Sequence, residues 1–323
     1  MSSHHPTTAG PRLVGTVCQQ WTDVESKLNG LLASSRHASD YPLKVAQLVA
    51  LIDGLLKEDP AGAQFLLFHR SITQCIGYSA LHSLLCAVLC RLVASTFSLA
   101  DAERQALVCA ALTMNIGMTL IQDELALQKH RPTADQRAQI QNHPALGEQM
   151  LRDAGVTDEL WLKTVAQHHM PALVPGKLLD AEPVARLVKI LQTLDRFTAA
   201  LSPRKSRSGK NAHDSVRAVV VREASRHDEV GIALLQILGV CPPGTYVRLS
   251  DGEIAVVLRR GRKPGLPLVA CIINRSGDLI GIPRSRDLAH ESLTVQEALY
   301  PAHVRVSLNL ERMLKLMPKP IST

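Results

Sequence analysis

The sequence predicts a mainly α-helical fold, a helical bundle followed by a small C-terminal antiparallel β module. Three observations support this fold class. The 323 residues are 46% hydrophobic but only 3% aromatic, so Leu, Ala and Val supply most of the core, which favours packed helices over a large β sandwich. Apolar residues recur at helical spacing over residues 13–238. After CPPGTY (241–246) the pattern changes to short β-rich runs separated by turns.

The chain divides into five predicted segments. Residues 1–12 lack an apolar stretch like that of a signal peptide and are expected to form a disordered lead. Residues 13–70 form an N-terminal helical segment, with helical periodicity in YPLKVAQLVALIDGLL and a break at EDPAGA. Residues 71–240 form the main helical domain. Residues 241–290 form the β module, and 291–323 form a C-terminal tail in which VSLNLERMLKLM predicts one more helix.

Capping residues mark helix ends within residues 71–240. Thr133 and Gln136 have the spacing of a capping box, which predicts a helix start. Pro144 cannot donate a backbone hydrogen bond, so a new helix is expected to begin there, and Pro183 is expected in the first turn of EPVARLVKILQTLDRFTAAL. Further helices are predicted in TDELWLKTVAQHH and AHDSVRAVVVREA.

The β module contains three short runs with strand composition, TYVRLS, EIAVVLRR and LPLVACIIN. Asp251-Gly252, GRKPG and Ser276-Gly277 provide the turns between and after them. A module of about fifty residues is too small to form an enzyme by itself. The chemistry is therefore expected in the helical domain.

Charge and composition limit the range of partners. The net charge of +7 and the pI near 9.1 suit an anionic ligand, but no basic stripe is interleaved with aromatic residues, so nucleic acid is not a favoured partner. The positive charge concentrates in SPRKSRSGK (202–210) and RRGRK (259–263), which are typical of solvated loops. Residues 71–90 contain no Asp, Glu, Lys or Arg, yet their several polar side chains favour a buried core helix over a membrane span. We expect a cytoplasmic protein with no membrane partner.

Seven cysteines without a CxxC pair indicate a reducing compartment rather than a disulfide framework. Cys86 and Cys90 share one helical face in LLCAVLCRL. No metal-binding partner is assigned to them, and both are expected to be buried small apolar residues.

Histidine and aspartate residues recur at helix ends in the central domain. His143 precedes a proline, His168 and His169 close a predicted helix, and Asp195 lies within LQTLDRFTAA. Adjacent imidazoles at a helix end can meet one metal ion or two neighbouring ions. His82 lies on an apolar helix, where a single histidine is usually a core residue.

The order of these features is similar to the HD-GYP family of HD-domain phosphohydrolases over about residues 78–238. The matching pieces are His82-Ser83, AALTMNIGM, the Asn142–Gly147 segment NHPALG, VAQHH and LQTLDRFTAALSPR. The PPGTYVRLSDGEIAVVLRR segment resembles a C-terminal extension of such proteins. The resemblance implies an all-helical domain that binds two or three transition metals, commonly iron or manganese, and hydrolyses the bacterial second messenger cyclic di-GMP.

The resemblance also implies roles for individual residues. Ser202 and Arg204 match an S-x-R motif whose Arg faces the phosphates of the ligand, which would give the basic run at 202–210 a purpose. The implied metal ligands are His82, His143, His168, His169 and Asp195.

Several family positions are altered in this chain. The His-Asp pair that gives the family its name is replaced by Met114 and Asn115, and Met118 stands where the family has Lys. Tyr78 replaces a Glu, and Thr198 replaces the second Asp of a D-x-x-D step. MPALVPGK follows VAQHH, so the Glu and the Gly-Tyr-Pro loop of the family are absent from this sequence.

These changes reduce the ability of the site to hold several metals. Asn115 is a neutral and poor bridging ligand, and the thioether of Met114 matches iron or manganese poorly. Met118 carries no charge to stabilise a phosphate. The retained imidazoles and carboxylate could still bind one Zn²⁺, Fe²⁺ or Mn²⁺, and the residues leave open whether any metal is bound.

We therefore predict a catalytically impaired HD-GYP-like signalling protein that binds cyclic di-GMP or a protein partner and acts as a regulator. The alternative is a divergent metal-dependent phosphodiesterase that hydrolyses cyclic di-GMP or another phosphoester. A further alternative is a scaffold that binds no ligand.

Overall fold

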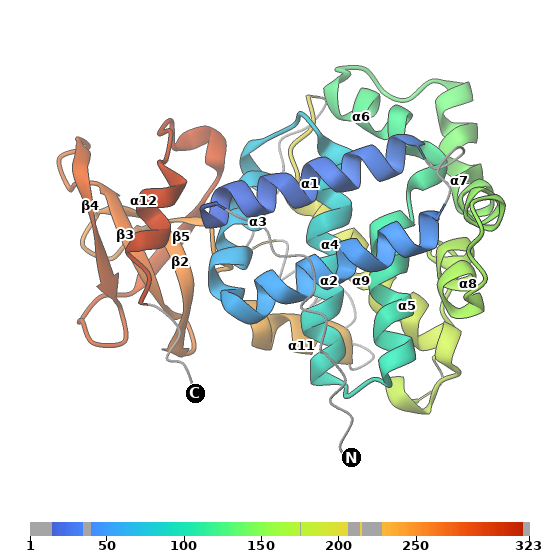
Figure 1. The fold of residues 1–323 in the computed structure, drawn as a ribbon. Helices are drawn as coiled ribbons and strands as arrows, with labels where there is room; N and C mark the ends of the chain where they lie inside the picture. Colours follow the sequence, from blue (N-terminus) through green and yellow to red (C-terminus); the bar gives the residue numbers. More distant parts are fainter. Residues whose placement is uncertain (1–14, 35–39, 175, 206–213, 215–227, 319–323) are drawn as a thin grey trace, which may run out of the picture.

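The computed structural model of the chain describes residues 15–34, 40–174, 176–205, 214 and 228–318. It has a helical bundle beside a small antiparallel sheet, as Figure 1 shows, so the predicted fold class is confirmed. The expected disordered lead and the helix predicted in AHDSVRAVVVREA lie outside the described residues, except for Asp214.

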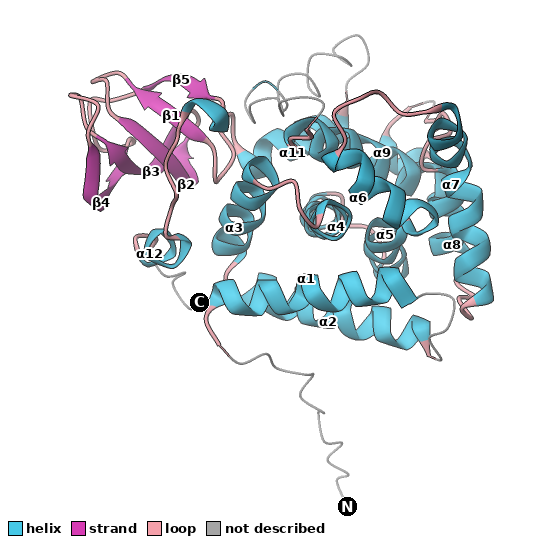
Figure 2. Ribbon diagram, turned by 90° about the horizontal axis from the view of Figure 1, so that it is seen from above, coloured by secondary structure: helices cyan, strands magenta, loops and turns pink. Residues whose placement is uncertain are grey.

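The N-terminal helices are part of the bundle. Helices α1 (Val17–Ser34) and α2 (Tyr41–Glu58) lie side by side along one flank of it (Figures 1 and 2). Helix α3 (Pro60–Thr73) begins where Asp59 accepts a hydrogen bond of 2.8 Å from the backbone N–H of Gly62. Large side chains on these helices, including Trp21 and Phe65, are almost fully buried in the main core.

Helix α4 (Tyr78–Thr96) runs through the centre of the bundle, with other helices around it in Figure 2. Its residues from Tyr78 to Cys90 are all buried, which explains why this segment carries no charge. Two stretches, Tyr78–Thr96 and Asp101–Leu127, have the length and apolar composition of membrane-crossing helices. In this fold 78% of the most apolar part of each is buried inside the protein, as expected of core helices.

Capping residues place the next helices much as predicted. The hydroxyl of Thr133 accepts from the backbone of Gln136 at 3.2 Å, and the Gln136 side chain accepts from the backbone of Thr133 at 3.0 Å. The helices that follow α4 in the described residues are α5 (Asp101–Thr113), η1 (Ile116–Met118), α6 (Thr119–Leu127), α7 (Ala134–Asp153), α8 (Glu159–Gln167), η2 (Leu178–Asp180), α9 (Pro183–Leu201) and α11 (Glu229–Leu238).

The prediction of a helix start at Pro144 is wrong, because α7 continues through this residue. The missing N–H of Pro144 would have bonded the carbonyl of Ile140. That carbonyl instead accepts a hydrogen bond of 2.6 Å from Nδ1 of His143. The side chain thus satisfies the backbone group that the proline leaves open, and the helix is not interrupted.

The sheet has the order β4-β3-β2-β1-β5 and is antiparallel throughout. Its strands are β1 (Tyr246–Leu249), β2 (Ile254–Lys263), β3 (Leu266–Ile273), β4 (Leu279–Asp287) and β5 (Val295–Leu299). The first three correspond to the three predicted runs.

The sheet extends past the expected boundary at residue 290. Strand β5 belongs to the segment predicted as a tail, and it pairs with β1 in a register that places Leu299 opposite Tyr246. Its sequence VQEAL is short and half exposed at a sheet edge, so it has little of the apolar signal that identifies a strand. The helix predicted after it is present as α12 (Leu310–Lys315), preceded by the short η3 (Pro301–His303).

Helix α3 joins the bundle to the sheet (Figure 1). His69 of α3 packs edge-on against Tyr246 of β1, with ring centroids 5.7 Å apart. Gly244 lies so close to α3 that a Cβ there would be 2.6 Å from the backbone nitrogen of His69, and its φ of +83° favours glycine. The sheet and the bundle therefore meet in close backbone contact at this point.

Candidate metal centre

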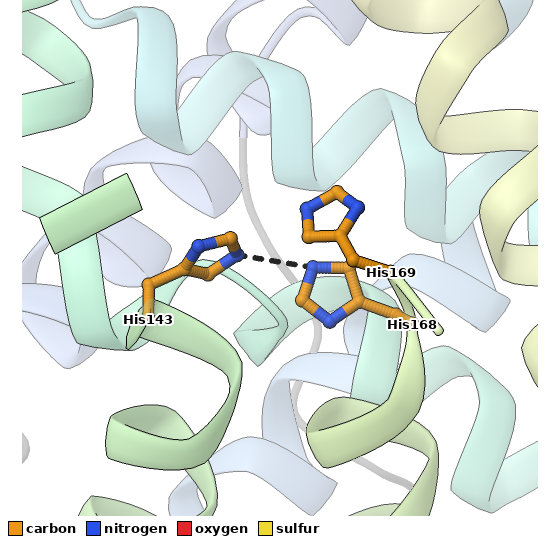
Figure 3. Close-up of side chains that lie close together, drawn as sticks. All are labelled: His143, His168 and His169. Atoms are coloured by element: carbon orange, nitrogen blue, oxygen red, sulfur yellow. Dashed lines mark hydrogen bonds between the residues drawn. The ribbon is translucent and has the colours of Figure 1, made fainter. Parts of the chain in front are cut away.

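Three histidines from α7 and from the end of α8 converge (Figure 3). His143 comes from the middle of α7, and His168 and His169 follow the last residue of α8. One ring nitrogen from each lies within 4.8 Å of those of the other two, and Nε2 of His143 is 3.1 Å from Nε2 of His168. His143 and His168 are fully buried, whereas His169 is exposed. We call these residues the three-histidine cluster.

The backbone fixes the orientation of the two buried rings. Nδ1 of His143 donates to the carbonyl of Ile140, and Nδ1 of His168 donates to the carbonyl of Val165 at 2.7 Å, near the end of α8. A carbonyl can only accept, so each Nδ1 carries a proton. Burial lowers the pKa of His143 to about 4 and that of His168 to about 3, so both rings are neutral at pH 7.

Two neutral rings held in this way direct the lone pairs of their Nε2 atoms toward each other across 3.1 Å. Two acceptors at this distance repel unless a cation lies at the cluster. A backbone carbonyl that holds Nδ1 while Nε2 stays available is the usual arrangement of a metal-binding histidine. With the imidazole of His169, the cluster fits one divalent transition metal with an open coordination position.

The altered turn lies beside this cluster. Met114 and Asn115 follow α5 and are buried, 0% and 4% exposed. Gly117, two residues on, approaches α7 so closely that a Cβ would be 2.5 Å from the carbonyl oxygen of His143. Thr113 accepts a hydrogen bond of 2.8 Å from the indole of Trp161, which ties this turn to α8. The turn is thus packed against α7 and tied to α8, and Met114 and Asn115 give it no charged or imidazole side chain.

A second group consists of His82, Cys86 and Asp195, whose ligand atoms also lie within 4.8 Å of one another. Nε2 of His82 is 2.8 Å from the carboxylate of Asp195, which comes from α9. Burial would lower the pKa of His82, but Cys86 and Asp195 raise it and the net shift is upward, to about 10. Burial would raise the pKa of Asp195, but His82, with smaller effects from His168 and His169, lowers it to about 2. Asp195 therefore belongs to this second group, as an ionised carboxylate paired with His82.

Cys86 is buried as expected, but it is more than an apolar residue in the core. Its Sγ is 3.8 Å from Nε2 of His82 and 2.9 Å from the hydroxyl of Thr198. The sequence predicted only a buried apolar residue at this position, and these polar contacts correct that prediction. The available signal was its spacing four residues after His82, which puts both side chains on one helical face.

The two residues expected to bind phosphate have different surroundings. The guanidinium of Arg204 lies 5.0 Å above the ring of Tyr78 and donates a 2.9 Å hydrogen bond to its hydroxyl. Tyr78 in turn stacks on His82, with ring centroids 5.5 Å apart. Ser202 is buried, and its hydroxyl donates to the carbonyl of Thr198 at the end of α9. Arg204 is therefore connected through Tyr78 to His82, whereas Ser202 is turned back into its own helix.

No family model matches the chain. A cyclic di-GMP phosphodiesterase of Pseudomonas aeruginosa is 25% identical over 185 residues, which cover 57% of this chain and 45% of that protein. The chain thus matches less than half of the length of this relative. A solved structure described as an HDG"Y"P protein from Bdellovibrio bacteriovorus aligns with 72% of this chain and 74% of its own, at a TM-score of 0.45 and 16% identity. Over 57% of its length the chain is therefore similar to a cyclic di-GMP phosphodiesterase.

The residues that match the HD-GYP pattern in the sequence form two groups in this structure. The three-histidine cluster holds three of the implied ligands, and His82 and Asp195 belong to the second group. Met114 and Asn115 occupy the pair position with neutral side chains. Candidate ligands for a transition metal are therefore present, in an arrangement with fewer negative charges than the family pattern.

Proposed function

We propose that the chain is a divergent metal-dependent phosphodiesterase of the HD-GYP type, with cyclic di-GMP or a related phosphodiester as its substrate. The observation that carries this proposal is the pair of neutral Nε2 atoms of His143 and His168 facing each other at 3.1 Å beside His169. The phosphodiesterase activity of the Pseudomonas relative supports this alternative better than the impaired regulator that the sequence predicted. A cyclic dinucleotide substrate would place the activity in the cytoplasm.

The three-histidine cluster would hold one Zn²⁺, Fe²⁺ or Mn²⁺, which supplies a Lewis acid and lowers the pKa of a bound water. Asp195 remains ionised at neutral pH, because its pairing with His82 keeps its pKa at about 2. We expect its carboxylate to accept a hydrogen bond from water and to orient it. Arg204 supplies positive charge next to Tyr78, suited to a phosphate oxygen.

We expect slow turnover. Met118 stands where the family has a Lys, and Asn115 cannot supply the bridging carboxylate of the family pattern. Removal of a single group that stabilises transition-state charge typically costs on the order of 10²-fold in turnover. The proposed enzyme therefore acts well below the rate of a site with the full His-Asp pair.

Binding without turnover is the second candidate function, and the buried, neutral Met114 and Asn115 favour it. In this case the chain is a regulator that binds cyclic di-GMP or a protein partner. Arg204 and Tyr78 would contribute to ligand binding in both candidates.

Turnover of cyclic di-GMP under anaerobic conditions with added Mn²⁺ or Fe²⁺ tests the enzyme. We expect measurable hydrolysis that His168→Ala abolishes and that His130→Ala, a change at an exposed histidine, leaves intact. Equal hydrolysis by His168→Ala protein would contradict the proposal and indicate a contaminating enzyme.

If no turnover is found, calorimetry with cyclic di-GMP separates the regulator from the scaffold. Binding of cyclic di-GMP without turnover, with a weaker affinity in Arg204→Ala protein, would establish the regulator. Absence of any heat of binding would favour the scaffold that binds no ligand.

A further inference from the structure

Helices α4 and α9 bring together an imidazole, a thiol and a carboxylate. His82 and Cys86 lie one turn apart on α4, and Asp195 faces them from α9. The distances are 2.8 Å from the imidazole to the carboxylate and 3.8 Å from the imidazole to Sγ. His82 and Cys86 are completely buried, with 2% and 0% exposure. Three different donor atoms thus converge on one buried point.

We propose that His82, Cys86 and Asp195 form a second cation site in which the Cys86 thiolate is a ligand. The inference deepens the proposed function and rests on it, because it adds a second ion beside the three-histidine cluster. Binding places the cation where His82 and Asp195 now share a proton, and the imidazole and thiol protons are released to solvent.

The donor set determines which cations fit. One nitrogen, one sulfur and one oxygen suit Zn²⁺ or Co²⁺, which bind thiolate, imidazole and carboxylate together. Mg²⁺ and Mn²⁺ prefer oxygen ligands and are poor occupants of a site with a thiolate. The second site should therefore differ in metal preference from the all-imidazole cluster.

The thiolate would supply a negative charge that the altered turn lacks. Asn115 is neutral where the family has an aspartate, whereas a Cys86 thiolate carries a full charge next to Asp195. Thr198, one turn after Asp195 on α9, places its hydroxyl 2.9 Å from Sγ and can orient the sulfur. Cys86 and Thr198 thus form a contact between α4 and α9 in support of the second site.

Cobalt is the probe, because a Co²⁺–thiolate bond gives an intense near-ultraviolet absorption that imidazole and carboxylate ligands do not give. Metal-free full-length protein is titrated with Co²⁺ under reducing conditions, and bound metal is measured by elemental analysis. The wild type and Cys90→Ser are compared with Cys86→Ser. Cys90 is the matched control, since it is equally buried one turn further along α4 and lies outside both ligand groups.

We expect the wild type and Cys90→Ser to bind two Co²⁺ ions and to show the absorption. Cys86→Ser should lose the absorption and bind the second ion at least about tenfold more weakly. Absence of the thiolate absorption in wild-type protein that has bound Co²⁺ would overturn the inference, whatever the variants do, and would leave a buried ion pair between His82 and Asp195. The inference would also be overturned if Cys86→Ser protein kept the thiolate absorption.

A third variant distinguishes this inference from the proposed function. His143→Gln removes a ligand from the three-histidine cluster and leaves the second group intact. If His143→Gln protein loses bound metal and Cys86→Ser leaves metal content and absorption unchanged, only the three-histidine cluster binds metal. Loss of the thiolate absorption in Cys86→Ser with no effect of His143→Gln on metal content supports the second site and contradicts the proposed metal in the first.

Discussion

At the scale of single residues, Pro144 determines the state of His143. A proline in the middle of a helix leaves the carbonyl four residues earlier without its usual donor. Here that carbonyl belongs to Ile140 and accepts a hydrogen bond from Nδ1–H of His143, so Nε2 is left as an acceptor facing His168. The His-Pro pair therefore acts as a local device that prepares the imidazole to bind a cation.

Replacement of Pro144 by alanine tests this device. Alanine restores an N–H that competes for the carbonyl of Ile140 and releases the ring of His143. We expect Zn²⁺ binding to weaken by about 10- to 100-fold, as is usual when the partner of a metal-binding histidine is lost, with little loss of stability. Calorimetry and thermal unfolding measure the two effects. Pro183→Ala, at the start of α9, is the control, and equal Zn²⁺ affinity in both variants would contradict the role of Pro144.

Gly117 positions the altered turn against His143, because a Cβ at this residue would be 2.5 Å from the His143 carbonyl oxygen. Gly117→Ala must therefore push the turn or α7 aside. We expect a loss of about 1–3 kcal/mol of unfolding free energy, typical of overpacking, together with weaker Zn²⁺ binding. Gly54→Ala is the control. Gly54 is exposed in α2 and a Cβ there would have no neighbour within 4 Å, so this variant should gain up to about 1 kcal/mol of unfolding free energy. Denaturant titrations that show no difference between the variants would exclude this packing argument.

At the scale of elements, the contact between α3 and β1 holds a buried neutral histidine. Burial lowers the pKa of His69 to about 4, from an ordinary value near 6.5. The unfolded chain then binds more protons than the folded protein between these two values, so stability is complete above about pH 6.5 and decreases as the pH falls toward 4.

Removal of this titration should flatten the pH dependence of stability. Between pH 7 and pH 5, His69 accounts for about 2 kcal/mol of lost unfolding free energy. We expect His69→Gln to be less stable than the wild type at pH 7 but to lose about 2 kcal/mol less on going to pH 5. Denaturant titrations at both pH values provide the measurement, with His130→Gln as an exposed control. A parallel decrease in wild type and His69→Gln would show that His69 does not titrate in this way.

Local signals allowed most elements to be predicted, and long-range contacts explain the failures. The capping box at Thr133 and the proline at the start of α9 act within one turn, so their sequence pattern is sufficient. Strand β5 owes its conformation to pairing with β1, some fifty residues earlier, and its own sequence is weakly β-forming. The failure at Pro144 arose because a side chain replaced the expected backbone donor.

The same distinction applies to the candidate site. The resemblance selected His143, His168 and His169, and the structure brings them together. It could not indicate Cys86, because this residue belongs to no family motif and its importance depends on how α9 brings Asp195 to α4. The role of Arg204 also depends on a long-range contact, since Tyr78 is 126 positions away in the chain.

At the scale of the whole molecule, one continuous core connects the site to the N-terminal helices, to one face of the sheet and to α12. The buried cluster includes Trp21 of α1, Leu162 of α8, Tyr246 of β1 and Met313 of α12. A ligand that binds only the folded state stabilises everything that unfolds with its site. Metal binding at the three-histidine cluster should therefore be detected in distant helices.

The two tryptophans make this coupling measurable. Trp161 lies on α8 near the site, and Trp21 lies on α1 in the N-terminal segment. In Trp161→Phe/Cys86→Ser protein, fluorescence reports on Trp21 alone and the second site is weakened. We expect Zn²⁺ at one hundred times its Kd to stabilise this signal by about 2.7 kcal/mol, and no stabilisation in a variant that also carries His168→Gln. A Trp21 signal that does not respond to metal would show that α1 unfolds independently of the site.

The central claim is that the three-histidine cluster binds a divalent metal ion, and calorimetric titration of metal-free protein with Zn²⁺ tests it most directly. The wild type, the His143→Gln/His168→Gln double variant and the exposed control His130→Gln are compared, each in a Cys86→Ser background that weakens the second site. The account predicts that wild type and control bind the first Zn²⁺ equally well and that the double variant binds it at least about 10²-fold more weakly. Equal affinity of the first Zn²⁺ for all three proteins would contradict it.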